Sequence, residues 1–216
     1  MPTVSKATLL SWTAAERLSL ADLLEDLSEA EWRTRSLCPA WTMHDLAAHL
    51  TLSTRTSLSG FLKGILRARG NFDRMEADAA RARAARFTPA ELIAQLRETA
   101  HSPRRSPLSA PQDPLVDALV HGQDIARPLG RPRAMPGPQA ETALARVLSS
   151  PFYGARHRLN GATLTATDRD WTSTPNPPPG TEIRGPISDL LLLATGRPAG
   201  LAALSGPGRT RLRLSK

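Results

Sequence analysis

The sequence contains few of the residues that mark several classes of protein. Its single cysteine, Cys38, excludes an intramolecular disulfide framework and favours a reducing compartment. We expect Cys38 to be a small buried apolar residue rather than a nucleophile. No apolar run approaches the roughly 18 residues of a membrane span, and the N-terminus lacks the basic and apolar regions of a signal peptide. The sequence therefore predicts a cytoplasmic protein that has no membrane partner.

Lysine is also scarce, and the charge of the chain is carried by arginine. Only three of the 28 cationic side chains are lysine, and the formal net charge is +8. Arginine suits anionic partners because it contacts carboxylate or phosphate through two prongs, although a GC-rich genome produces the same bias. Acids interrupt the basic run at residues 67–87, and its only aromatics are Phe72 and Phe87. We therefore expect no nucleic-acid partner.

The rest of the composition is that of a globular protein, and helical periodicity dominates its first two-thirds. With 216 residues, 40% hydrophobic and 22% charged, the chain can bury one good core. Leucines over residues 5–30 predict one long helix, with Trp12 as the point of any break. Capping signals predict helix starts at Thr42 and Thr88. The helices expected after the first cover residues 42–65, 67–86, 88–101, 113–129 and 139–149.

The pattern changes after about residue 150. Residues 162–167 and 181–184 predict short strands on either side of a proline-rich turn, and 209–214 predict an edge strand. Residues 187–195 predict an apolar helix. We therefore expect a mainly α protein, with a helical bundle over residues 1–150 and a small α+β domain over residues 155–216.

Two predicted helices carry polar side chains on faces that should be buried. On the helix that follows residue 42, His49 lies inside the apolar arc, whereas His44 lies on the solvent side. On the helix from residue 113, Asp117, His121 and Asp124 fall within about 60° of one another and form a polar stripe between apolar residues. Groups of this kind are costly to bury unless they are paired or bind a metal.

A metal site is one of several chemical explanations for these residues. Two imidazoles and a carboxylate with an open fourth position are typical of catalytic zinc, and helical bundles build metal sites from facing helices. His49, Asp117 and His121 are therefore candidate metal ligands. A hydrogen-bonded core histidine and a plain Asp117–His121 ion pair are the alternatives, and Asp124 has Arg127 as an alternative partner.

Three separated segments are similar to a known family. They read LCPAWTMHDLAAHL (37–50), DALVHGQDIARPLGRPR (117–133) and RGPISDLLLLATGRP (184–198). In this order they resemble the mycothiol-dependent maleylpyruvate isomerase family, which belongs to the DinB-like (YfiT-like) metal-binding four-helix bundles. The resemblance covers nearly the whole chain. It implies a DinB-like four-helix bundle followed by a small C-terminal α+β domain.

The resemblance also implies a set of metal ligands. The family's divalent metal, usually zinc, is bound by a histidine on the second helix and an acid–histidine pair on a later one, which here are His49, Asp117 and His121. The best-known members have Glu as the acid, so Asp117 is one methylene shorter. Asp124 would orient a metal ligand without binding the metal itself, and so would Asp45 if it did not act as a helix cap.

The chemistry implied by the resemblance is that of a metal-activated thiol. Mycothiol, the thiol of high-GC Gram-positive (actinobacterial) cells, would coordinate the metal, whose charge lowers the pKa of the thiol. The thiolate can isomerise an activated double bond or attack another small electrophile as an S-transferase. Arg197 is the candidate partner of an anionic substrate, with a helix C-terminal cation as its alternative. The alternative function is a non-catalytic member of the fold that binds a thiol or small ligand.

Overall fold

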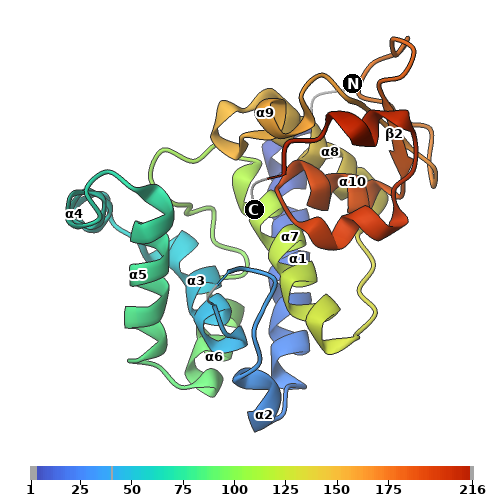
Figure 1. The fold of residues 1–216 in the computed structure, drawn as a ribbon. Coiled ribbons are helices and arrows are strands. Elements are labelled where there is room, and N and C mark those ends of the chain that lie inside the picture. Colours follow the sequence, from blue (N-terminus) through green and yellow to red (C-terminus); the bar gives the residue numbers. More distant parts are fainter. Residues whose placement is uncertain (1–3, 40, 215–216) are drawn as a thin grey trace. The chain divides into compact units, whose positions relative to one another are not determined.

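The structure, a computed structural model, describes residues 4–39 and 41–214, which form two compact units divided between Arg133 and Ala134 (Figure 1). The helices of the first unit are α1 (Lys6–Glu25), α2 (Glu29–Trp32), α3 (Met43–Arg55), α4 (Leu58–Arg67), α5 (Phe72–Ala84), α6 (Pro89–Glu98), α7 (Asp113–Ala126) and the 3-10 helix η1 (Arg127–Leu129). The elements of the second unit are α8 (Gly137–Ser149), η2 (Pro151–Tyr153), α9 (Ala155–Leu159), β1 (Thr163–Ala166), β2 (Glu182–Gly185), α10 (Ile187–Ala194), η3 (Pro198–Ala203) and η4 (Pro207–Arg211).

Four helices of the first unit close a bundle. α1 packs against α6 and α7, and α3 packs against the same two helices, so each of the four has two neighbours. Their shared core is made of aliphatic side chains that are almost completely buried, among them Leu20, Leu46, Leu96 and Ile125. α5 packs against α3, and α4 packs against α5. The predicted mainly helical class is confirmed.

Two of the predicted helices are interrupted, in each case at a serine. The N-terminal helix continues through Trp12 and stops before Ser28, whose hydroxyl accepts a hydrogen bond from the Glu31 N–H and begins α2. The second predicted helix stops before Ser57, whose hydroxyl accepts from the Gly60 N–H and begins α4. Serine side chains compete for backbone hydrogen bonds and so favour caps over helix interiors. The caps predicted at residues 42 and 88 are confirmed as capping boxes.

The second unit is built on a parallel strand pair. β1 pairs with β2 from Thr163–Glu182 to Ala166–Gly185, and the apolar helix α10 packs against β1, β2 and α8. Because α8 packs on α10, it belongs to this unit, and the division falls earlier than the boundary expected near residue 150. The edge strand predicted over 209–214 is wrong. Residues 209–211 instead belong to η4, and residues 212–214 form neither helix nor strand.

None of the helices in the described ranges has the length and apolarity required to cross a membrane.

Candidate metal centre

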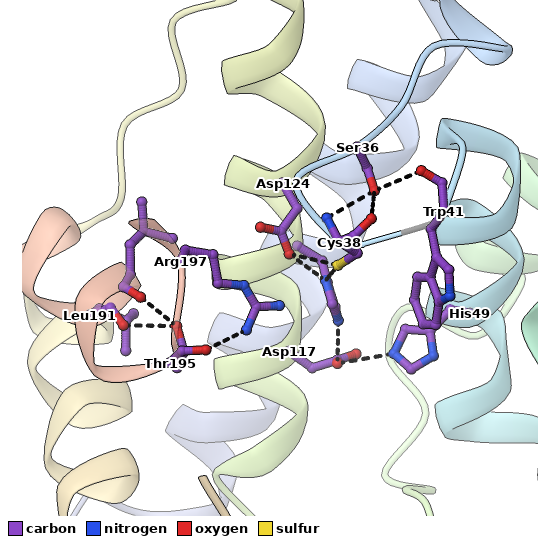
Figure 2. Close-up of polar contacts among 11 residues, drawn as sticks. Ser36, Cys38, Trp41, His49, Asp117, Asp124, Leu191, Thr195 and Arg197 are labelled. Atoms are coloured by element: carbon purple, nitrogen blue, oxygen red, sulfur yellow. Dashed lines mark hydrogen bonds and ion pairs between the residues drawn. The ribbon is translucent and has the colours of Figure 1, made fainter. Parts of the chain in front are cut away.

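Three side chains from facing helices meet beside the core of the first unit (Figure 2). His49 extends from α3, and Asp117 and His121 from α7, which packs against α3. The Oδ1 atom of Asp117 lies 3.4 Å from Nε2 of His49 and 3.2 Å from Nε2 of His121. One ligand atom from each residue lies within 4.8 Å of the others. The structure therefore brings together the three residues that the sequence singled out.

The start of α3 is fixed by its capping box. Oδ2 of Asp45 accepts hydrogen bonds from the N–H of Thr42 at 2.9 Å and from its hydroxyl at 2.8 Å. The structure thus gives Asp45 the role of a helix cap, which the sequence favoured over the orientation of a metal ligand. His44 also differs from His49, because its Nε2 lies 2.9 Å from the Phe87 carbonyl, away from the cluster.

Each histidine of the cluster meets a second carboxylate at its other ring nitrogen. Nδ1 of His121 lies 2.8 Å from Oδ2 of Asp124, which is completely buried. Nδ1 of His49 lies 3.1 Å from Oε2 of Glu76 on α5 as an ion pair that is poorly aligned for a hydrogen bond. A carboxylate at Nδ1 favours a proton on that nitrogen and leaves the Nε2 lone pair for a ligand. Both Nε2 atoms face Asp117.

Glu76 was not identified from the sequence. It lies in an Arg/Ala-rich stretch in which acids and bases alternate, and such a pattern is typical of a solvated helix. One signal could have identified it. Glu76 lies four residues before Ala80, which is completely buried, and residues at that spacing share a helix face.

The connector before α3 covers one side of the cluster. Trp41 is 8% exposed, and its ring centroid lies 4.9 Å from that of His49 and 6.4 Å from that of His121. Cys38 donates its S–H to Oδ2 of Asp124 at 3.2 Å, and its sulfur lies 3.7 Å from Nδ1 of His121. Cys38 therefore packs against the core as a partly buried side chain, as expected, and also makes polar contacts with the cluster that the sequence did not indicate.

In the absence of a metal, the cluster is a network of ion pairs. Burial opposes a charge on His49, but the hydrogen bond to Asp117 and the neighbouring Glu76 carboxylate outweigh it and raise the pKa of His49. Burial likewise opposes a charge on His121, but the charge of Asp117 raises the pKa of His121 well above its ordinary value. Burial opposes ionisation of Asp117, yet the charge of His121 and hydrogen bonds from both imidazoles hold the pKa of Asp117 well below its usual range.

The donor set fits a divalent transition-metal ion. Tetrahedral zinc has bonds of about 2.0–2.2 Å to histidine and carboxylate, which places neighbouring donors about 3.3 Å apart. The two distances from Asp117 Oδ1, 3.4 Å and 3.2 Å, are close to this value. Asp117 therefore reaches both imidazoles, although its side chain is one methylene shorter than glutamate. Two imidazoles and one carboxylate, with carboxylates behind both rings, are also the ligand chemistry of a zinc site.

Arg197 belongs to the second unit and lies just after α10. Its Nη1 donates to the Thr195 carbonyl at 2.8 Å, which is the position of a helix C-terminal cation. Arg158, which nothing in the sequence distinguishes from the many other arginines, donates to the Ala194 carbonyl at 2.5 Å. Burial and then the charge of Arg197 lower the pKa of Arg158, so the two guanidinium groups are electrostatically coupled. A role for Arg197 with an anionic substrate stays a prediction.

Comparison with known proteins gives one family. Residues 13–135 match the model described as mycothiol maleylpyruvate isomerase N-terminal domain. No curated protein and no solved structure gives a match. The matched segment is more than half of the chain and includes His49, Asp117 and His121. The chain therefore belongs to the mycothiol maleylpyruvate isomerase N-terminal domain family.

Proposed function

We propose that this protein is a mycothiol-dependent enzyme that binds a divalent metal, zinc by preference, and acts on a small electrophile as a cis–trans isomerase or an S-transferase. The observation that carries the proposal is the convergence of His49 Nε2, His121 Nε2 and Asp117 Oδ1. Membership of the family supports the thiol and the metal together.

Each residue of the cluster has a distinct task in this proposal. His49, His121 and Asp117 would hold the ion, which, when bound, supplies the charge that makes a thiolate available near neutral pH. Asp124 and Glu76 keep the histidine protons on Nδ1, so both Nε2 lone pairs face inward.

Residues outside the ligand set would exclude water and bind the substrate. The indole of Trp41 packs against the His49 ring at a tilt of 48° and restricts water on that side. Arg197, together with Arg158, would bind the anionic group of a substrate through bidentate contacts. Replacement of Arg197 by glutamine should then raise KM for an anionic substrate and leave the metal content unchanged.

The decisive experiment is turnover by zinc-loaded protein with and without mycothiol. Maleylpyruvate tests isomerisation, and a chromogenic electrophile tests S-transfer. Mycothiol-dependent turnover of either one supports an enzyme. Mycothiol binding without turnover of either would favour the non-catalytic alternative, whereas failure to bind both metal and mycothiol would contradict the proposal.

Glu76→Gln tests whether a second carboxylate supports His49. We expect its zinc affinity to fall about tenfold to a hundredfold, because outer-shell partners of metal-binding histidines have effects of this size. Affinity is measured by competition with a chromogenic chelator. Asp78→Asn is the matched control, since Asp78 lies on the same helix and pairs with Arg74 at the surface. Equal affinities for the two variants would remove Glu76 from the site.

Zinc affinity should also fall as the pH is lowered. Both histidine pKa values are raised above 6.5 in the metal-free cluster, so protons begin to compete with the metal above that pH. Once both imidazoles are protonated, affinity should fall by up to about a hundredfold per pH unit, because two protons must leave before the ion binds. Chelator competition between about pH 8 and pH 5 measures the slope. A flat profile would contradict two histidine ligands.

A further inference from the structure

α4 presents an apolar face that the structure leaves exposed. Leu58 is 58% exposed, Leu62 54% and Leu66 79%. These leucines are four residues apart, so they form a line along one side of the helix. Phe61 and Ile65, which are half-buried, widen the apolar arc to about 140°. We call these five residues the α4 apolar face.

The other side of α4 is the one that packs against the unit. Gly64 lies against Met75 of α5, where a Cβ on the glycine would come within 2.9 Å of the Met75 Cγ. On the helix, Gly64 is about 130° from the middle of the apolar face. The apolar face is therefore turned away from α5, and Figure 1 shows α4 at the margin of its unit, beyond α5.

The remainder of this surface is cationic. Lys63 and Arg67 lie on the polar side of the helix, about 60° and 100° beyond the edge of the apolar face. Arg69 follows the end of the helix, and all three cations are exposed. Residues 56–72 contain no acid, and no acidic side chain in the described part of the chain pairs with these three cations. A helix with leucines on one side and lysine and arginine on the other is typical of one that lies in a membrane interface.

We propose that α4 docks on an anionic lipid surface. The α4 apolar face would enter the boundary between headgroups and acyl chains. Lys63, the cation nearest the edge of that face, would contact lipid phosphates, and Arg67 and Arg69 would add to the attraction by the anionic surface. A second copy of the chain fits less well, because pairing two such helices brings like charges together without an acid to balance them. A fluid lipid surface also needs no groove to receive a convex helix. This docking goes beyond the proposed thiol chemistry, does not require a metal, and replaces our expectation from the sequence that the protein has no membrane partner.

The experiment is co-sedimentation of the full chain with phosphatidylcholine vesicles, with and without phosphatidylglycerol. We expect the protein to sediment with the anionic vesicles at low salt, to remain in solution with neutral ones, and to be released as salt is added. Leu62→Ser/Leu66→Ser should reduce the partition coefficient about tenfold or more, since it removes two buried leucines from the interface. Lys63→Gln/Arg67→Gln should reduce it by a similar factor.

Matched controls separate docking through α4 from attraction by the overall positive charge. Leu108→Ser removes a leucine that is 90% exposed elsewhere in the same unit, and Arg81→Gln/Arg104→Gln removes two exposed cations away from α4. Both should bind vesicles within about twofold of the wild type, given the short reach of screened charges. Equal loss in the two charge variants, or no loss in the leucine variant, would overturn the proposal. The proposal would also be overturned if light scattering showed a dimer that Leu62→Ser/Leu66→Ser abolishes, because the α4 apolar face would then bind a second copy of the chain.

Discussion

Zinc should be nearly absent from His49→Ala protein that is purified without added metal. His49 supplies one of the three converging donors, and its loss leaves Asp117 and His121 as the two remaining donors of this set. Since outer-shell changes alone cost tenfold to a hundredfold, we expect removal of a ligand to weaken affinity by more than about a hundredfold. Elemental analysis of dialysed protein measures the loss, and His121→Ala should behave in the same way.

His44→Ala is the matched control for this experiment. It removes the same side chain from the same helix, but His44 contacts the Phe87 carbonyl rather than the cluster. Its metal content should equal that of the wild type. Full zinc occupancy in His49→Ala, or none in the wild type, would contradict the metal site and leave the cluster as a network of buried ion pairs.

Arg133→Met should destabilise the first unit by about 3 kcal/mol or more, because one charge of a buried pair is left without its partner. Nη2 of Arg133 lies 2.8 Å from Oε2 of Glu16, and the two side chains are only 11% and 9% exposed. Nη1 of Arg133 also donates to the Ser19 hydroxyl at 3.0 Å. Burial raises the pKa of Glu16 and Arg133 counteracts this, so Glu16 should take up a proton more readily in the variant.

Urea unfolding of chelator-treated protein measures this loss without a contribution from metal. Arg33→Met is the control, since the Arg33–Glu29 pair is 78% and 90% exposed, and its effect should stay within about 0.5 kcal/mol. Adding Glu16→Leu to Arg133→Met should recover much of the stability, as expected when a buried pair is replaced as a whole. A loss below about 1 kcal/mol in the single variant would contradict this account.

The central residues of the site were predictable because they lie on regular helices. A period of 3.6 residues places His49 on the inner face of α3 and aligns Asp117, His121 and Asp124 on α7. Trp41 and Cys38 were not assigned to the site, because they lie in a connector whose path is set by long-range contacts rather than by a repeating pattern. Glu76 was missed since its partner is distant in sequence and its neighbours are solvated.

The fold, like the site, was predictable where it consists of regular helices. Long helices with strong apolar periodicity and clear caps, such as α6, begin where the sequence predicts. At Ser28 and Ser57 the chain can either continue the helix or start a new one with the serine as its cap. These two states differ little in free energy, so the sequence alone does not decide between them. The last predicted strand failed because alternation of arginine with leucine does not show that a partner strand is present.

The contact between His49 and Asp117 joins segments 68 residues apart. A metal ion bound there would act as a removable cross-link that closes this long loop. Closing such a loop lowers the conformational entropy of the chain. An ion that binds only the folded form offsets this loss, because it raises the free energy of unfolding in proportion to the logarithm of its free concentration. The melting temperature of the first unit would then follow the metal supply, so a cell short of metal would hold less of the folded protein.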